Sequence, residues 1–413
     1  MKKQILTAAV LSALLLGGCG SQAAAVPTPP ANAEIVEMNA ESKSADALFT
    51  EAEYRFALEL LRNTLQAKPG ENVMLSPYSV MQALGMTFNG AAGQTRTEAE
   101  KVLIGGHTLE ELNQYLYGWR AVRPAEQGSC TLHTANSIWI NEKIRDVKDA
   151  FLQQNQQYYA SDIRRAAFNK AALREINGFV KKETDNMVPQ ILDTLDPAAM
   201  LVLVNAVCFD AKWAVPYEKA QVESACFTNA DGSKSDVQMM TATESDYFAQ
   251  DGACGFLKYY DGQYTFAGIL PPEGVSVQAW LDAQTENSLI SLIGGRTTEP
   301  VLASVPEFSA DTSAQLEAIL PEMGMQTAFS NSADFSGISD EALQIDEVVH
   351  KTHIEVGAEG TKAAAATAVI MSKGATMTAA PEIKTVRLDR PFVYMILDMT
   401  NELPVFIGTV QKM

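Results

Sequence analysis

A stretch of small residues between positions 359 and 380 constrains the fold more than any other feature of this 413-residue chain. Its core, residues 360–371, contains four consecutive alanines. Strand-like segments flank it at residues 343–356 and 386–399, so it forms a long connection between two sheet elements. Connections of this length are uncommon in compact domains and usually have a function.

The local pattern leaves three interpretations of this stretch open. Alanine favours a helix, the small residues suit a disordered linker, and Thr367, Val369 and Ile370 favour a strand. Gly360 can serve as a pivot because it lacks Cβ. In an extended strand, alternate residues face opposite sides. One side would carry Thr361, Ala363, Ala365 and Thr367, and the other would carry Lys362, Ala364 and Ala366.

The first 19 residues have the pattern of a bacterial lipoprotein signal. Lys2 and Lys3 precede an apolar run at residues 5–16, and small residues lead to Cys19. The run is short for a membrane span. We therefore expect a signal peptide at residues 1–18, a lipidated Cys19, and a flexible tether over residues 19–45, which are rich in Ala, Pro and Ser. The protein would be exported and anchored by its lipid to the cell surface, or released.

Composition limits the classes of partner. The chain is 47% hydrophobic and 20% charged, as in globular proteins. Loss of residues 1–18 removes two lysines and no acid, which changes the net charge from −19 to −21. Such a chain should avoid nucleic acid. We expect mostly buried thiols at the four remaining cysteines, with a disulfide possible in an exported chain: Cys130, Cys208, Cys226 and Cys254.

Several motifs follow one another in a fixed order along the chain. Residues 72–103 predict a buried helix that begins at Ser76-Pro77, a glycine turn and a second helix. Residues 201–213 begin with a nearly continuous apolar run, typical of a central strand covered on both faces. Further motifs lie at residues 134–140, 168–192, 306–308, 333–338, 389–392 and 404–410. In this order, the motifs resemble those of the serpins, the serine protease inhibitor family.

The resemblance implies a fold and a domain organisation. The fold would be α+β, with three β-sheets surrounded by about nine helices and an exposed reactive-centre loop at about residues 359–385. Residues 46–413 would form one serpin domain. The resemblance also implies a sheet-opening cluster under the main sheet, made of Ser76, Ser79, Asn205 and His350. Asn205 interrupts the apolar strand, and a buried amide without partners costs about 1–3 kcal/mol, so it should be hydrogen-bonded.

The resemblance further implies suicide inhibition of a serine protease. The protease would be acylated by the loop, and the freed segment from Thr361 would insert between the strands at residues 201–209 and 343–356. The protein would act as a monomer, without a cofactor or metal. The hinge comprises Gly360, Thr361, Lys362, Ala363, Ala364, Ala365, Ala366 and Thr367.

Two alternatives to inhibition are a non-inhibitory binding protein and a hydrolase. A non-inhibitory serpin-fold binding protein would carry bulky, charged or proline residues in the hinge, whereas these residues are mostly small. Two departures from the family pattern are Ala358 and Lys362, each at a position where glutamate is common. A hydrolase lacks support, since no Gly-x-Ser-x-Gly or His-Glu-x-x-His motif is present. The protein is therefore not expected to be an enzyme.

The family's count from the hinge glycine sets the expected cleavage site. It puts Gly374 before the cut bond and Ala375 after it, which suits an elastase-like or subtilisin-like protease. Cleavage after Lys373 by a trypsin-like protease is the second choice. Thr376 and Met377 remain weaker alternatives, because the loop is several residues longer than usual.

Overall fold

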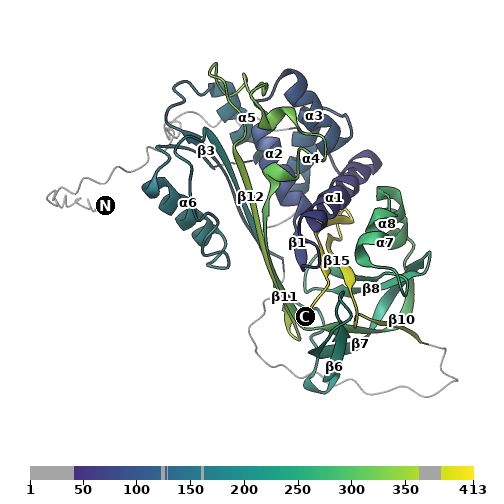
Figure 1. Cartoon of the computed structure of the whole chain (residues 1–413). Coiled ribbons are helices and arrows are strands. Elements are labelled where there is room, and N and C mark those ends of the chain that lie inside the picture. Colours follow the sequence, from purple (N-terminus) through teal and green to yellow (C-terminus); the bar gives the residue numbers. More distant parts are fainter. Residues whose placement is uncertain (1–40, 122–125, 128, 160–161, 362–382) are drawn as a thin grey trace, which may run out of the picture.

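The computed structural model describes residues 41–121, 126–127, 129–159, 162–361 and 383–413. Within these ranges the chain forms an α+β fold of eight α-helices, three short 3-10 helices and two β-sheets (Figure 1). The helices are α1 (Ala47–Ala67), α2 (Pro77–Phe88), α3 (Gly93–Ile104), α4 (Leu109–Ala121), α5 (Asp149–Tyr159), α6 (Lys170–Glu183), α7 (Val277–Asp282) and α8 (Glu286–Gly294). The 3-10 helices are Lys219–Gln221, Leu316–Ala318 and Thr327–Phe329.

The first sheet has seven strands and contains the long central strands of the fold. Its order is β11-β12-β13-β5-β3-β2, with β4 paired to β3 and β12 also paired directly to β5. The strands are β11 (Phe308–Gln315), β12 (Glu347–Gly357), β13 (Gly360–Thr361), β5 (Leu201–Lys212), β3 (Cys130–Asn141), β2 (Glu126–Gln127) and β4 (Asp162–Ala166). We use "hinge end" for the end of this sheet where β5 and β12 terminate, and "foot" for the end where they begin.

The second sheet has nine strands in the order β1-β16-β15-β9-β8-β7-β10-β14, with β6 paired to β7. Within β7, residues 234–240 pair with β6, residues 239–247 pair with β10, and the last five residues, 246–250, pair with β8. The described residues therefore form two sheets, whereas the family resemblance implied three. The strands are β1 (Val73–Leu75), β16 (Leu403–Val410), β15 (Phe392–Asp398), β9 (Tyr264–Leu270), β8 (Ala253–Tyr259), β7 (Lys234–Gln250), β10 (Thr297–Pro306), β14 (Lys384–Arg387) and β6 (Val222–Thr228).

Helices cover the seven-stranded sheet on both faces. Helix α6 lies on one face, and α2 with its neighbouring helices lies on the other (Figure 1). As predicted, α2 begins at Pro77 with Ser76 as N-cap, and all its residues are buried. The following helix, α3, has Ala92 at its N-cap and no side-chain cap.

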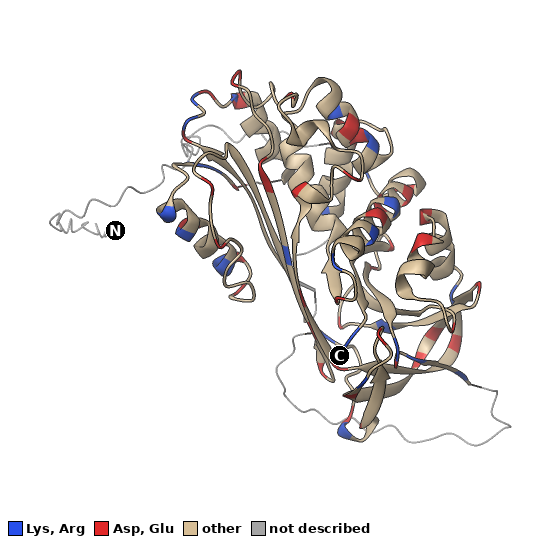
Figure 2. Cartoon of the chain, viewed as in Figure 1, with Lys and Arg blue, Asp and Glu red and all other residues tan. Residues whose placement is uncertain are grey.

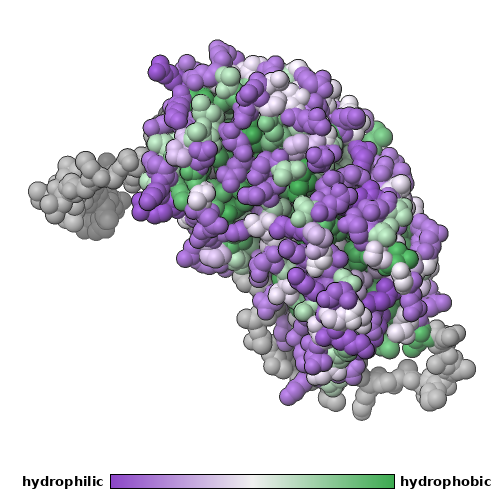
Figure 3. All heavy atoms as spheres, in the orientation of Figure 1, coloured by the Kyte–Doolittle hydropathy of each residue, from purple (hydrophilic) through white to green (hydrophobic). Residues whose placement is uncertain are grey.

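Charged residues lie mainly on helices and loops, whereas the long central strands are largely uncharged (Figure 2). The face shown in Figure 3 is mostly hydrophilic, with scattered hydrophobic patches. Among the described residues, no helix is long and apolar enough to cross a membrane. Of the four described cysteines, Cys130 and Cys208 are buried, Cys254 is half-buried, and Cys226 on β6 is exposed.

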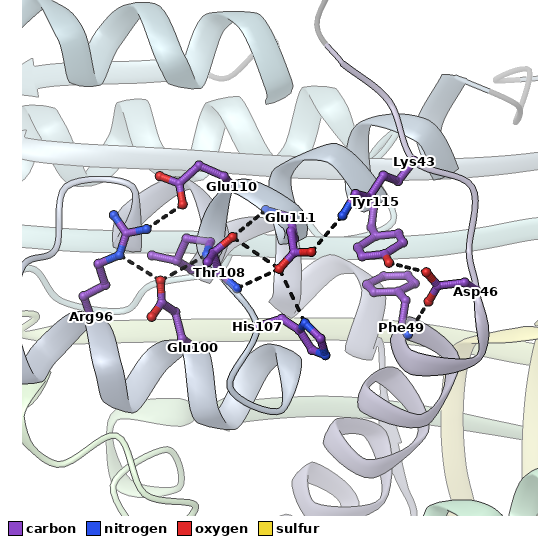
Figure 4. Close-up of polar contacts among 11 residues, drawn as sticks. Lys43, Asp46, Phe49, Arg96, Glu100, His107, Thr108, Glu110, Glu111 and Tyr115 are labelled. Carbon is purple, nitrogen blue, oxygen red and sulfur yellow. Dashed lines mark hydrogen bonds and ion pairs between the residues drawn. The ribbon is translucent and has the colours of Figure 1, made fainter.

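The segment before α1 contacts α4 (Figure 4). Lys43 Nζ lies 2.8 Å from Glu111 Oε1, and the Lys43 amide donates to Gln114 O at 3.1 Å. Asp46 caps α1 by accepting from the Phe49 amide, and it also accepts from the Tyr115 hydroxyl. Lys43 therefore belongs to the packed part of the structure, three residues before residue 46, the expected start of the domain.

Candidate functional site

The first two hinge residues form β13, which lies between β12 and β5 at the hinge end. Thr361 pairs antiparallel with Val356 on one side and with Ala211 on the other. Both Gly360 and Thr361 are buried, so this end of the expected exposed loop is part of the sheet. The other end is also in a strand, because β14 begins at Lys384 and pairs with β10.

Gly360 is required by close backbone packing. A Cβ on this residue would lie 2.1 Å from Ala211 O, and its φ of +154° is rarely adopted by residues with a side chain. From the sequence, Gly360 was expected to serve as a pivot. The structure gives a more specific reason, since no other residue fits at this point between the two strands.

Thr361 is held by an aromatic group beneath the sheet. Its Oγ1 lies 2.7 Å from the Tyr260 hydroxyl, and the Tyr260 ring stacks on Trp213 with centroids 4.3 Å apart. Burial raises the pKa of Tyr260, so its hydroxyl stays protonated and available for hydrogen bonding. These contacts fix the point from which the rest of the hinge would continue.

Backbone hydrogen bonds hold the turn between β12 and β13. Trp213 Nε1 donates to Gly357 O at 2.9 Å, and the Trp213 amide donates to Glu359 O at 3.0 Å. The Tyr217 amide donates to Ala358 O at 2.9 Å. Ala358 is therefore anchored through its carbonyl, and the turn is held without a charged side chain at this position.

A buried ion pair lies under the same aromatic residues. Lys258 Nζ is 2.8 Å from Glu244 Oε1, with side-chain exposures of 3% and 13%. The ammonium also lies 4.1 Å from the centroid of the Tyr217 ring. Burial lowers the pKa of Lys258, although Glu244 opposes that shift. This pair was not predictable from the sequence, because Glu244 lies on β7 and Lys258 on β8, and the residue pattern of a strand does not reveal contacts with another strand.

Towards the foot, β5 and β12 pair directly with each other. This ladder is parallel and runs from the pair Val202 and Glu347 to the pair Cys208 and His353. The strands separate only at the hinge end, where β13 enters. The sheet thus has a closed part, where β5 and β12 pair directly, and an open end, where β13 lies between them.

The structure brings the four predicted cluster residues together in the middle of this ladder. Asn205 on β5 pairs in register with His350 on β12, and Asn205 Oδ1 contacts His350 Nδ1. Asn205 Nδ2 donates to Ser79 O at 2.9 Å and lies 2.7 Å from Ser79 Oγ. The Ser76 amide donates to His350 Nε2 at 3.1 Å. All four residues are buried, and the expectation that Asn205 is hydrogen-bonded is met.

The hydrogen bonds define the protonation of His350. Nε2 accepts from the Ser76 amide, so Nδ1 carries the hydrogen and donates to Asn205 Oδ1. Burial lowers the pKa of His350 to about 3. The ring is therefore neutral at physiological pH, and each of its two nitrogens has a partner.

Two further residues extend the cluster beyond the sequence prediction. Asn136 on β3 pairs in register with Asn205, and Asn136 Oδ1 accepts from Asn205 Nδ2. Gln82 Oε1 accepts from Asn136 Nδ2 at 3.0 Å. Two features of the sequence pointed to these residues. Asn136 is an amide within a predicted strand, and Gln82 lies at helical spacing from Ser76 and Ser79.

Helix α6 covers the other face of the ladder. Ala172, Ile176 and Val180 of α6 form an apolar cluster with strand residues that include Val204, Ala206 and Cys208 on β5 and Val349 on β12. Asn177 ties α6 to the segment that follows it, because its Oδ1 accepts from two backbone amides, Ile191 and Leu192. Both faces of the β5–β12 ladder are consequently buried.

Acidic residues at the foot have structural roles. Asp346 Oδ2 accepts from the amides of Met200 and Leu201. Burial raises the pKa of Glu347 to about 7, with Glu317 and Asp196 adding to the shift. No group of three or more His, Cys, Asp or Glu within the described ranges could hold a metal ion.

The remaining predicted site residues lie outside the described residues. These are Lys362 and 363–367 of the hinge, the candidate cleavage residues Lys373, Gly374, Ala375, Thr376 and Met377, and the lipidation site Cys19.

Comparisons with known proteins identify the family. The model of the family described as Serpin (serine protease inhibitor) matches residues 51–413. Iripin-2 of Ixodes ricinus is 30% identical over 380 residues, which cover 89% of this chain and 94% of that protein. An uncharacterised serpin-like protein of Thermococcus kodakarensis is 32% identical over 352 residues, covering 83% and 80% of the two chains.

The native state of tengpin, a thermophilic serpin, superimposes with a TM-score of 0.84 and 37% identity, covering 90% of this chain and 97% of that one. The chain therefore belongs to the serpin family, and the predicted serpin fold is confirmed. Members of this family are generally protease inhibitors.

The neutral state of His350 predicts a specific pH dependence. Below pH 6.5 an unfolded chain gains a proton at this residue, whereas the folded chain does not until about pH 3. The stabilisation that neutral His350 contributes is thus fully present above pH 6.5. As the pH falls below 6.5, the free energy of unfolding decreases by about 1.4 kcal/mol per pH unit. Between pH 6.5 and 4.5 the urea midpoint of the wild type should fall more than that of His350→Gln. Parallel pH profiles would contradict a buried neutral ring.

Proposed function

We propose that this protein is a suicide-substrate inhibitor of serine proteases. A target protease cleaves the loop and is acylated by it, and the segment that begins at Thr361 then inserts between β5 and β12. The observation that carries the proposal is the position of β13, which already lies between these two strands and pairs with both.

The register of β13 can be continued along the whole ladder. Thr361 pairs antiparallel with Val356 and Ala211, so each later residue steps one position back along both strands. The pairs of β12 and β5 residues reached in this way are those that face each other in the closed ladder. An inserting strand would therefore need no shift between β5 and β12, only their separation.

Small residues suit both faces of such a strand. On one face, Ala363 would lie between Ile354 and Phe209, and Ala365 between Thr352 and Val207; all four neighbours are buried. On the other face, Ala364, Ala366 and Ala368 would lie beside residues that include Cys208, Ala206 and Val204, under α6. Packed interiors leave little spare volume, which gives a reason for alanine on both faces. From the sequence alone, only the face that carries Thr361, Ala363, Ala365 and Thr367 was expected to be buried.

Thr367 supports the same register. It would reach the position between His350 and Asn205, whose hydrogen bond must break when the strands separate. The threonine hydroxyl can accept from His350 Nδ1 and donate to Asn205 Oδ1. Insertion would thus replace the broken hydrogen bond rather than leave two buried polar groups without partners.

The length of the segment fits cleavage near Gly374. In the continued register, residue 371 would reach Asp346 and Leu201 at the foot, where β5 begins. Some 14 residues at ~3.3 Å each span about 45 Å, which would carry an attached protease along the sheet to the foot. At ~1 kcal/mol for each net hydrogen bond, insertion would release on the order of 10 kcal/mol. The uncleaved fold would then be a kinetic trap.

We also propose that the protein is exported and lipidated at Cys19, which would hold it at the cell surface. The basic, apolar and small-residue order of residues 1–19 supports this part of the proposal. The inhibitor would act as a monomer, with the protease as its covalent partner.

The test uses the purified domain and a panel of elastase-like, subtilisin-like and trypsin-like serine proteases. We expect a covalent complex that survives denaturing electrophoresis, and release of a C-terminal fragment that begins at Ala375. A fragment that begins at Gly374 would favour a trypsin-like target. Cleavage within residues 373–377 without any complex would instead support a non-inhibitory binding protein.

Substitution of Ala365 should convert the inhibitor to a substrate. Ala365→Arg would place a long cation beside the buried Thr352 and Val207, and we expect the trapped fraction of protease to fall about tenfold or more. Ala379→Arg is the matched control, because residue 379 follows the proposed cut and does not insert. Equal trapping by the two variants would contradict the continued register.

Cleavage of the loop should stabilise the domain. An inserted strand adds hydrogen bonds and buried surface, so the melting temperature should rise by roughly 10 °C or more after one cut within residues 373–377. Calorimetry of intact and cleaved protein measures this change. Unchanged melting would rule out a metastable uncleaved fold.

A further inference from the structure

A buried lysine lies beneath the residues that hold the β12–β13 turn. Lys258 on β8 makes contacts of three kinds through its Nζ. This atom lies 2.8 Å from Glu244 Oε1 and donates to Val215 O at 3.2 Å. It also lies over two aromatic rings, 4.1 Å from the centroid of Tyr217 and 5.3 Å from that of Trp213. The ammonium therefore contacts a carboxylate, a backbone carbonyl and two aromatic faces.

These two aromatic residues hold the turn in different ways. Trp213 donates to the turn from both its amide and its Nε1, whereas Tyr217 donates only from its amide. Among the described residues, the Tyr217 hydroxyl is buried without a hydrogen-bond partner. No polar contact therefore fixes the far end of this ring. Its orientation depends on the groups packed against its face, and Lys258 Nζ is one of them.

The carboxylate partner connects Lys258 to the other strand that borders the expected loop. Glu244 on β7 pairs in register with Val301 on β10, and Val301 pairs with Lys384 at the start of β14. The ion pair thus lies between the row of strands that ends at β14 and the aromatic residues that hold the β12–β13 turn. One buried contact relates the positions of both ends of the loop.

Stability alone gives a poor reason for an ion pair at this position. Burial disfavours the charged lysine and lowers its pKa. Replacing a buried ion pair by apolar residues of similar volume is often neutral or stabilising. A cation, however, is attracted to the faces of aromatic rings, which an uncharged side chain of the same length is not. The ammonium therefore contributes an orientation that an apolar core would lack.

We propose that Lys258 is a positioning residue for the β12–β13 turn. Its ammonium holds the rings of Trp213 and Tyr217, and these residues hold the turn from which an inserting strand would continue. This inference rests on the proposed function. A loosely held turn would delay the start of insertion, and delay favours release of the protease by deacylation. Loss of the ammonium should thus raise the number of inhibitor molecules consumed for each protease trapped.

The test compares the purified protein with two variants. Lys258→Met keeps most of the volume and removes the charge, and the double variant adds Glu244→Gln, so that no buried carboxylate is left without a partner. Lys258→Met alone should melt at a lower temperature, and the double variant should recover most of this loss. Both variants should still consume about three- to tenfold more inhibitor per trapped protease. Lys148→Met, in a surface ion pair with Asp340, is the control and should match the wild type.

A second readout needs no protease. The emission of Trp213 is obtained as the difference between each protein and its counterpart with Trp213→Phe. Acrylamide should quench this emission about twofold more strongly in the double variant than in the wild type, although the two proteins melt at similar temperatures. A purely stabilising ion pair would not produce this difference. If Lys258→Met alone does not fold, the double variant still carries both measurements.

Wild-type trapping by the double variant would overturn the inference, because the pair would then act only through stability. Unchanged quenching of Trp213 in the double variant would also overturn it, since the ammonium would not hold the indole. Failure of the proposed function looks different. In that case the wild type itself would trap no protease and gain no stability on cleavage, while the quenching comparison would still show whether Lys258 positions Trp213.

Discussion

Direct hydrogen bonding between β5 and β12 is the interaction on which the rest of the structure depends. These strands pair in parallel over seven residues, and they hold the two halves of the sheet together. The polar cluster crosses this ladder at Asn205 and His350, and α6 covers it on the opposite face. At the hinge end the same two strands part to admit Gly360 and Thr361.

Different forces act on the two parts of the split sheet. The hinge end is fixed by aromatic packing of Trp213 and Tyr260 and by hydrogen bonds to the backbone of the β12–β13 turn. The closed part is held by its own ladder and by two hydrogen bonds at the start of α2, in which the Ser76 amide donates to His350 and Asn205 donates to the Ser79 carbonyl. Because His350 is neutral and both of its nitrogens have partners, separation of the strands costs hydrogen-bond energy rather than charge energy.

The sequence predicted those features that depend on local pattern. Ser76-Pro77 marked the start of α2, and the apolar run at residues 201–209 marked the central strand. Asn205 stood out because an amide in such a run needs a partner. Contacts across strands were not predictable in this way. Asn136 joined the cluster through register with Asn205, and the Lys258–Glu244 pair depends on how β7 and β8 align.

The number of sheets depends on the same kind of contact. The family resemblance implied three sheets, and the described residues form two, because β7 pairs with β6 and β10 as well as with β8 and so joins these strands in one sheet. The expected loop at residues 359–385 was also longer than the connection between the strands, because Gly360 and Thr361 are already in β13 and Lys384 begins β14. A small-residue pattern does not show where pairing stops.

The parallel direction of the β5–β12 ladder has a thermodynamic consequence. Parallel pairing is slightly less stable per residue than antiparallel pairing. A chain that entered between these strands in the direction of β13 would run antiparallel to both. One weaker ladder would be exchanged for two stronger ones, and the sheet would gain a complete new set of backbone partners along its length. Chain direction alone therefore favours the expanded sheet, before any side chain is considered.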